Sequence, residues 1–431
     1  MSSPSDRHYT RIHRCRACGN TRLTSVLDLG MQALTGRFPG PGEPDPPIAP
    51  LELMICDTTD APDACGLVQL AHTCDANLMY GATYGYRSSV TTMMVAHLHR
   101  TADQVLTDAQ VKPGDGVLEI GSNDGTMQKY LAGRGFKLAA MDPSAGKFAS
   151  NYPQETTLLV DFFSAGAVQA AMPGQKFKAI ISLSMFYDLP EPLRFMQEIR
   201  DSLDPEGLWC FEQAYLPPTF TALCYDTICH EHLAYYGLHQ IQWLAKRAGL
   251  KLIDVATNDV NGGSFRVYAA RAESVRPANT AALNAAFALE DALHLAKTET
   301  WAVFAQRVRE HRARVEDFFE TASKAGEMVL GLGASTKLNV VLQYAGVTPT
   351  WMPAIGERDP LKVGLRTPRT SIPIISEDEA RARKPKYFFV GPWHFREEIV
   401  QREKPFIDNG GSLVFSLPRF EIVSKTGTRG G

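Results

Sequence analysis

The sequence predicts an α/β protein in which a Rossmann-like central domain lies between a small N-terminal domain and a second Rossmann-like domain at the C-terminus. Segments 117–125 and 328–339 each have the pattern of a buried strand, a glycine turn and the start of a helix. Pairs of cysteines with adjacent glycines occur in the N-terminal part of the chain. We therefore divide the chain into residues 1–78, 79–325 and 326–431.

The composition is that of an ordinary globular protein. Hydrophobic residues make up 44% and charged residues 21% of the 431 positions. The net charge of −3 argues against a nucleic-acid-binding surface. No apolar run approaches the roughly 20 residues that cross a bilayer, and the N-terminus lacks the apolar core of a signal peptide. We expect a cytoplasmic monomer that binds neither nucleic acid nor a membrane.

Four cysteines are spaced like metal ligands. Cys15 and Cys18 are separated by two residues and followed by a glycine. Cys65 is also followed by a glycine, and the eight residues between it and Cys56 have the length of an insertion in the second knuckle. Four thiolates would form a closed tetrahedral zinc site with a structural role. The alternative is a group of reduced, buried thiols.

The glycine turn at residues 121–125, here called the cofactor turn, indicates a nucleoside ligand. It follows a buried strand and opens a helix, whose free N–H groups and missing side chains let a ligand approach the backbone. The next strand ends at Asp142, and a carboxylate there suits the two ribose hydroxyls. The G-x-x-x-G spacing lacks the third glycine of a pyrophosphate loop, so S-adenosylmethionine is favoured over NAD. The predicted cofactor-binding residues are Glu119, Gly121, Asn123, Asp124, Gly125, Asp142, Pro143, Asp161, Phe162, Ser184, Met185 and Tyr187.

Strands and helices continue to alternate to about residue 270. This is the pattern of class I methyltransferases, in which parallel strands end in an antiparallel hairpin. We expect strands at 137–142, 157–163, 178–184, 207–212, 251–255 and 264–269, and helices at 126–133, 192–203, 240–248 and within 278–325. Residues 258–263, here called the NGG hairpin, join the last two strands.

Residues 225–232, here called the HEH segment, form an insertion after the fifth strand of this sheet. His230, Glu231 and His232 are a dense group of side chains that move protons near neutral pH. The alternative is a polar helix start with two surface histidines. Tyr84 and Tyr86 lie in a glycine-rich stretch that suits a mobile lid, or else a surface loop whose tyrosines pack on a neighbouring helix.

The C-terminal domain has a small-residue turn suited to a phosphate, with Ser335, Thr336 and Lys337 at a predicted helix start. The alternative is the NAD-binding half of a dehydrogenase, but the mixed run 357–359 stands where the ribose-binding acid is expected. The predicted substrate-binding residues are Ser335, Lys337, Asn339, Arg358, Trp393 and His394.

Together these segments resemble the sugar C-methyltransferases, which act on nucleotide-linked keto-deoxysugars for antibiotic and surface-polysaccharide biosynthesis. The resemblance covers nearly the whole chain and is carried by the cysteine knuckles leading to CGLVQL, and by YGYRSS, EIGSNDGT, YDTICHEH followed by YY, NGGSFRVY, GASTK and IPI. It implies S-adenosylmethionine and zinc as cofactors. It further implies methyl transfer to the carbon beside the 4-keto group of a sugar linked to dTDP, GDP or CDP.

The resemblance also implies catalytic roles. We expect His232 to remove the proton beside the ketone, oriented by Glu231, and Tyr84 or Tyr86 to donate to the enolate or to gate the site. His230 and Tyr225 are further candidates. Many relatives carry a tyrosine directly before HEH where this chain has Cys229, so Tyr225, Tyr235 or Tyr187 would take over its role.

Two other functions remain open from the sequence. One is an NAD-dependent sugar-nucleotide epimerase or dehydrogenase, which would use the same proton-abstracting residues. The other is a non-enzymatic zinc-ribbon adaptor, which would need neither the HEH segment nor the tyrosine loop.

Overall fold

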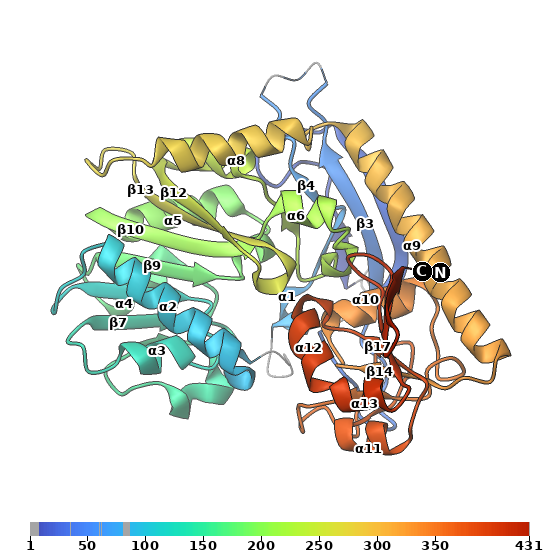
Figure 1. The fold of residues 1–431 in the computed structure, drawn as a ribbon. Coiled ribbons are helices and arrows are strands. Elements are labelled where there is room, and N and C mark those ends of the chain that lie inside the picture. Colours follow the sequence, from blue (N-terminus) through green and yellow to red (C-terminus); the bar gives the residue numbers. More distant parts are fainter. Residues whose placement is uncertain (1–7, 35, 60, 62, 81–86, 431) are drawn as a thin grey trace.

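The computed structural model describes residues 8–34, 36–59, 61, 63–80 and 87–430. Figure 1 shows the three parts of the chain, with the central sheet in cyan to yellow, the C-terminal sheet in orange to red and the blue N-terminal strands between them. Tyr84 and Tyr86 lie outside the described residues. None of the described helices is long and apolar enough to span a bilayer.

The N-terminal domain is a small antiparallel β-structure. Its four-stranded sheet has the order β11-β4-β3-β2, and β1 pairs separately with β5. Strand β11 comes from the chain just after the HEH segment, and Ala234 pairs there with Gln69 of β4. The HEH region is thus attached to the N-terminal sheet by main-chain hydrogen bonds. The elements are β1 (Tyr9–Arg11), β2 (Leu23–Ala33), β3 (Ile48–Cys56), β4 (Val68–Leu70), β5 (His72–Cys74), α1 (Ala76–Met79) and β11 (Ala234–Tyr235).

The central domain has a seven-stranded sheet of order β12-β13-β10-β9-β6-β7-β8, in which β6 to β10 are parallel and β13 is antiparallel to both neighbours. This confirms the predicted class I methyltransferase fold. Strand β6 is buried along its whole length, as expected where helices cover both faces of a parallel sheet. The strands are β6 (Gly116–Ile120), β7 (Lys137–Met141), β8 (Thr157–Leu159), β9 (Phe177–Leu183), β10 (Leu203–Ala214), β12 (Leu250–Asn258) and β13 (Ser264–Arg271).

Three helices of this domain lie close to predicted positions: α3 (Thr126–Leu131), α5 (Pro192–Ser202) and α7 (Leu238–Ala248). The other helical segments were not predicted from the sequence. They are η2 (Ser88–Val90), α2 (Thr92–Asp108), η3 (Ala145–Asn151), α4 (Ala165–Ala171), η4 (Phe186–Asp188), α6 (Leu216–Thr221), η5 (Tyr225–Thr227) and η6 (Val260–Gly262). The HEH segment itself is η5 followed by an irregular turn, so its histidines are on neither a helix nor a strand.

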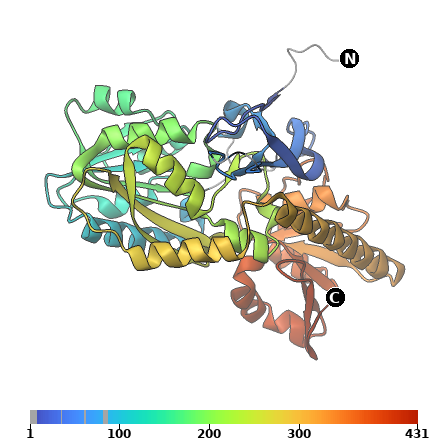
Figure 2. The ribbon, with the colours of Figure 1, turned by 90° about the horizontal axis from the view of Figure 1, so that it is seen from above.

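Two helices connect the central and C-terminal domains (Figures 1 and 2). α8 (Thr280–Ala292) packs on β12, and the 27-residue α9 (Thr298–Lys324) packs on β2. The buried residues of α9 recur at helical spacing, as an amphipathic helix requires. They are Trp301, Phe304, Ala305, Val308, His311, Val315, Phe319 and Ala322.

The C-terminal domain is a second α/β unit, as predicted. Its sheet has the order β16-β15-β14-β17-β18-β19-β20, with the first five strands parallel and the last two antiparallel. The strands are β14 (Val329–Leu332), β15 (Ile355–Glu357), β16 (Ile374–Ser376), β17 (Tyr387–Val390), β18 (Ser412–Phe415), β19 (Glu421–Ser424) and β20 (Gly427–Gly430). The helices are α10 (Thr336–Tyr344), α11 (Glu377–Ala382), η7 (Trp393–Phe395), α12 (Arg396–Arg402) and α13 (Lys404–Asp408).

Candidate active site and metal centre

The four predicted metal ligands lie together at one end of the N-terminal sheet. Their sulfur atoms are all within 4.8 Å of one another. Cys15 Sγ is 3.5 Å from Cys65 Sγ, and Cys18 Sγ is 3.4 Å from Cys56 Sγ. Tetrahedral Zn²⁺ with bonds of about 2.3 Å places its sulfur ligands roughly 3.8 Å apart, so this donor set fits zinc with no position left for water. The long second knuckle is therefore compatible with a metal site.

The cofactor turn brings the backbone of residues 121–125 to the carboxyl end of β6. Gly121 has φ +77°, and a Cβ atom there would meet Met185 Cγ at 3.1 Å. A side chain would therefore be strained and would crowd the floor of the turn. Asn123 and Asp124 are held by the chain before α2, because they accept hydrogen bonds from the N–H groups of Ser88 and Ser89. The turn is thus held in shape from the outside.

Asp142 supports the same turn. Its carboxylate accepts hydrogen bonds from the N–H groups of Asn123 at 2.9 Å and Ser144 at 2.6 Å. The Ser144 hydroxyl also donates to Oδ1, so of about four lone-pair positions on the carboxylate one remains, on Oδ2, for a ribose hydroxyl. Pro143 directly follows it. The Glu119 carboxyl, predicted to bind the cofactor, is buried and accepts a hydrogen bond from Gln128; burial raises its pKa to about 8.

The other predicted cofactor residues follow β8 and β9. Asp161 and Phe162 are exposed, and Phe162 is 46% accessible with its ring edge against Tyr80. Ser184 is exposed at φ 55°, and Met185 lies under Gly121. These residues surround the carboxyl ends of the parallel strands, where ligands of open α/β sheets bind.

His232 lies at this same end of the sheet. Its ring centroid is 4.2 Å from that of Tyr187, which is two residues beyond Met185. Nδ1 is 2.8 Å from the Thr227 carbonyl oxygen. A carbonyl can only accept, so Nδ1 carries the proton and the lone pair of neutral His232 is on Nε2. Burial lowers the pKa of His232 to about 4, with a smaller lowering by Lys337 against the opposing Thr227 hydrogen bond, so the ring is neutral at pH 7.

The other HEH residues have partners in the N-terminal domain. Glu231 accepts a hydrogen bond from Gly36 N at 3.1 Å in the N-terminal domain, and the partner of His232 Nδ1 is the Thr227 carbonyl. An orienting contact of Glu231 on His232 stays a prediction. Nε2 of buried His230 lies 3.2 Å from the Ala49 carbonyl, and burial lowers the pKa of this ring to about 4. His230 therefore faces the N-terminal sheet.

Tyr225 also has a structural partner. Its hydroxyl lies 2.9 Å from His311 Nδ1 on α9, and the His311 Nε2 lies 2.8 Å from the Ser416 carbonyl. An imidazole Nε2 facing a carbonyl is the donor, so Nδ1 accepts from the Tyr225 hydroxyl. The tyrosine is fully buried and connects the HEH segment to α9 and the C-terminal domain. This use of its only proton argues against the predicted catalytic role.

The C-terminal domain faces His232 through Lys337 and Trp393. Lys337 Nζ donates to the Asn261 carbonyl of the NGG hairpin at 2.6 Å, and Trp393 Nε1 donates to Asp226 Oδ2 at 2.7 Å. The NGG hairpin and the Trp393 ring lie very close together, since a Cβ atom at Gly262 would be 2.9 Å from that ring. These contacts join the C-terminal domain to both the hairpin and the HEH segment.

The remaining predicted substrate residues differ in how well they suit that role. His394 is mostly enclosed, and burial lowers its pKa to about 3, with Lys337 adding to the effect. Asn339 is buried on α10. The Ser335 hydroxyl caps α10 by accepting from Leu338 N, and Arg358 is an exposed residue paired with Glu398 at 3.6 Å. Ser335 and Arg358 are therefore the least suited of the predicted residues to bind the substrate.

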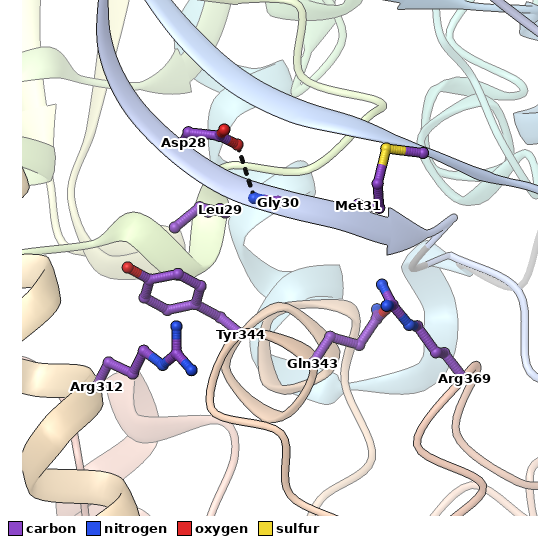
Figure 3. A pocket seen from close by; sticks show the side chains of 8 residues that line it. All are labelled: Asp28, Leu29, Gly30, Met31, Arg312, Gln343, Tyr344 and Arg369. Carbon is purple, nitrogen blue, oxygen red and sulfur yellow. Dashed lines mark hydrogen bonds between the residues drawn. The ribbon is translucent and has the colours of Figure 1, made fainter.

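A separate cleft of about 340 Å³ lies between β2, α9 and α10 (Figure 3). In this view Arg312 lies beside the Tyr344 ring, and Gln343 lies beside Arg369. The cleft adjoins the HEH segment at Tyr225, on which the Tyr344 ring packs and near which the Arg312 guanidinium lies. The cleft contains none of the predicted site residues.

Sequence reasoning missed two groups that the fold brings to the site. The Thr227 carbonyl orients His232, and Tyr80 donates to the Glu231 carbonyl at 3.1 Å. Asp188 lies beside both Tyr80 and Glu231; it belongs to the segment 185–188 after the fourth strand, which the sequence predicted to face the methyl group.

Comparison with known proteins gives a consistent result over most of the chain. Three family models match in order: a zinc binding domain at residues 15–80, a methyltransferase domain at 94–255 and a C-methyltransferase C-terminal domain at 259–418. The last includes the NGG hairpin and linking helices, which the sequence-based division places in the central domain. The chain is 27% identical over 424 residues to the C-methyltransferase NovU of Streptomyces niveus, covering 97% of this chain and 98% of that protein.

Solved structures match the central domain only weakly. The magnesium protoporphyrin IX methyltransferase ChlM of Synechocystis PCC 6803, with bound SAH, is 17% identical with a TM-score of 0.33, covering 44% of this chain and 90% of that chain. An S-adenosylmethionine-dependent methyltransferase from Clostridium acetobutylicum is 11% identical with a TM-score of 0.32, covering 41% and 92%. These scores are too low to support a conclusion beyond the strand order and the family models.

Proposed function

This chain belongs to the S-adenosylmethionine-dependent C-methyltransferases, and from this premise we propose that it methylates the carbon beside the keto group of a nucleotide-linked 4-keto-deoxysugar. The product is a branched sugar of the kind used in antibiotic or surface-polysaccharide biosynthesis. The observation that supports this most strongly is His232. It is a neutral imidazole with a fixed tautomer, placed next to the strand ends that form the cofactor turn.

His232 supplies the base that carbon methylation needs. The proton beside a ketone is weakly acidic, so a base must remove it before the carbon can form a new bond. In the proposed step Nε2 takes this proton, and the pair of the broken C–H bond passes into the enolate. The Thr227 carbonyl then stabilises the resulting imidazolium, because Nδ1–H remains its donor. The proton leaves His232 for solvent after the sugar departs.

The cofactor turn and Asp142 would hold S-adenosylmethionine, which supplies an electrophilic methyl group when bound. When the cofactor is bound, its sulfur would keep the electron pair of the methyl–sulfur bond as the methyl group passes to the enolate carbon. Positioning the two reactants is the contribution of the fold, and it accounts for a large part of such rate enhancements.

The sugar nucleotide would lie between the central and C-terminal domains. Lys337 and Trp393 are on the C-terminal side of that junction, and Lys337 is near enough to His232 to lower its pKa. A lysine at a helix N-terminus suits a phosphate of the nucleotide. Zinc would act at a distance, by holding the N-terminal sheet that pairs with β11. We propose that the enzyme acts in the cytoplasm, where reducing conditions keep the four cysteine ligands available for zinc.

The test is turnover with S-adenosylmethionine carrying a ¹³C-labelled methyl group and a panel of dTDP-, GDP- and CDP-linked 4-keto-deoxysugars. We expect one member of the panel to gain a methyl whose ¹³C signal is coupled to a ring carbon. A methyl found on oxygen or nitrogen, or a panel without any turnover, would contradict the proposal. NAD added in place of S-adenosylmethionine should give no reaction, which separates this function from an epimerase or dehydrogenase.

A further inference from the structure

We infer that Asp188 acts as a neutral carboxylic acid that donates a hydrogen bond to the enolate oxygen of the substrate. The inference rests on the proposed function and adds a residue to the same site. Asp188 is the last residue of η4, which follows the carboxyl end of β9. It directly follows Tyr187, whose ring lies against the proposed base His232.

One oxygen of this carboxyl has no role in the fold. Oδ1 of Asp188 is enclosed, and it has no hydrogen-bond partner among the described residues. A buried polar atom without a partner costs about 1–3 kcal/mol, so such atoms are retained mainly where function uses them. This enclosed oxygen follows the carboxyl end of β9 and belongs to the residue after Tyr187, which contacts the base, and there it would meet the reacting end of a substrate.

The surroundings decide which form the carboxyl takes. Burial raises the pKa of the Asp188 carboxyl well above its usual range, the Tyr80 hydroxyl opposes this rise, and nearby Glu231 adds a smaller increase. A buried carboxyl beside a second carboxyl is disfavoured as an anion, so Asp188 keeps its proton at neutral pH.

Two tyrosine hydroxyls near the HEH segment are already used as donors, whereas the Tyr236 hydroxyl has no hydrogen-bond partner among the described residues and lies by Cys15, Arg16 and Cys65 of the N-terminal domain. The Tyr225 hydroxyl donates to His311, and the Tyr235 hydroxyl donates to the Thr227 carbonyl at 3.3 Å. Cys229, directly before the motif, offers only a weak S–H donor, and its burial raises the pKa of the thiol well above its usual range. Asp188 and Asp226 each have a buried Oδ1 without a partner among the described residues. The other Asp226 oxygen accepts from Trp393, and we assign the donor to Asp188 because it follows Tyr187, whose ring lies against His232.

The donor acts without giving up its proton. As the C–H pair moves into the enolate, negative charge gathers on the former keto oxygen, and the Asp188 O–H bond points its hydrogen at that oxygen. Removing one such donor commonly lowers kcat by about 10²–10³-fold. Its effect belongs to proton abstraction, so it can be measured without methyl transfer.

The experiment compares Asp188→Ala, Asp188→Asn and the surface control Asp201→Asn with the unmodified protein. Each is assayed for kcat, for binding of S-adenosylhomocysteine by calorimetry, and for exchange of the substrate α-proton with deuterated solvent in the absence of methyl donor. We expect Asp188→Ala to lose about 100-fold in both kcat and exchange with unchanged S-adenosylhomocysteine affinity. Asp188→Asn should recover most of the exchange rate, because its amide still donates a hydrogen bond.

The outcomes separate the two hypotheses. If the unmodified protein turns over its sugar nucleotide and Asp188→Ala does so equally well, the role of Asp188 is refuted and the proposed function stands. If Asp188→Asn is as slow as Asp188→Ala, the carboxyl works in its ionised form and the neutral-donor inference is wrong. If the unmodified protein neither exchanges nor methylates any 4-keto-deoxysugar nucleotide, the proposed function fails, and the role of Asp188 fails with it.

Discussion

Replacing His232 by asparagine tests the proposed base with little disturbance of the fold. The asparagine amide can donate to the Thr227 carbonyl in place of Nδ1, which is 2.8 Å from that oxygen, but it has no group that takes a proton at neutral pH. The variant also loses the ring contact with Tyr187, worth about 0.5–1.5 kcal/mol. The expected fall in stability is therefore small.

The expected fall in activity is large. A positioned general base commonly contributes about 10²–10⁴-fold, which corresponds to about 3–5 kcal/mol of the barrier. The assay measures kcat, solvent-deuterium exchange at the substrate carbon and S-adenosylhomocysteine binding in parallel. We expect kcat and exchange to fall together while cofactor affinity and thermal stability change little.

His230→Gln is the matched control in the same motif. His230 faces the Ala49 carbonyl through Nε2, and a glutamine amide can replace that donor, so we expect a change in stability and a kcat within tenfold of the starting protein. If His232→Asn keeps more than about a tenth of the activity, or if His230→Gln is the slower variant, the assignment of the base is wrong.

Three further predictions follow from other parts of the molecule. Replacing Cys15 by serine should release the metal and lower the melting temperature more than it lowers kcat per folded molecule; a variant of normal stability that never contained zinc by elemental analysis would contradict the structural role. Trp393→Phe removes the donor to the buried Asp226 carboxyl, whose pKa is raised by burial, and should cost about 1–3 kcal/mol in urea unfolding, with a lower kcat because Asp226 precedes Thr227; an unchanged unfolding midpoint would argue against this contact. Burial lowers the pKa of His232 to about 4, so the ring loses its basic form only as the pH falls toward 4. We therefore expect kcat/KM to decline on the acid side well below pH 6.5. An inflection due to this histidine at pH 6–7 would refute the buried, neutral state.

Local patterns predicted the fold well because they depend on neighbours in the chain. The strand, glycine turn and helix at the cofactor turn appear where the sequence indicated, and so does the corresponding turn of the C-terminal domain. A strand buried on both faces, such as β6, has a continuous apolar run, and a position with positive φ, such as Gly121, favours glycine. Both features can therefore be read from the residue types. The grouping of Cys15 with the second cysteine pair was also visible from type and spacing.

The contacts of the HEH segment could not be predicted in this way. Glu231 meets Gly36 across 195 positions of sequence, and Tyr225 meets His311 across 86. Pairing of β11 with β4 depends on how the N-terminal sheet is placed, and no short pattern encodes it. The sequence therefore indicated which side chains could move a proton, whereas the choice of Thr227 as the orienting group needed the three-dimensional arrangement.

The most direct measurement of the proposed chemistry is a crystal structure with S-adenosylhomocysteine and an unreactive analogue of the 4-keto-deoxysugar nucleotide. We predict that His232 Nε2 lies about 3–3.5 Å from the ring carbon beside the carbonyl, with that carbon facing the cofactor sulfur. A sugar ring bound out of reach of His232, or turned so that this carbon faces away from the sulfur, would contradict the account.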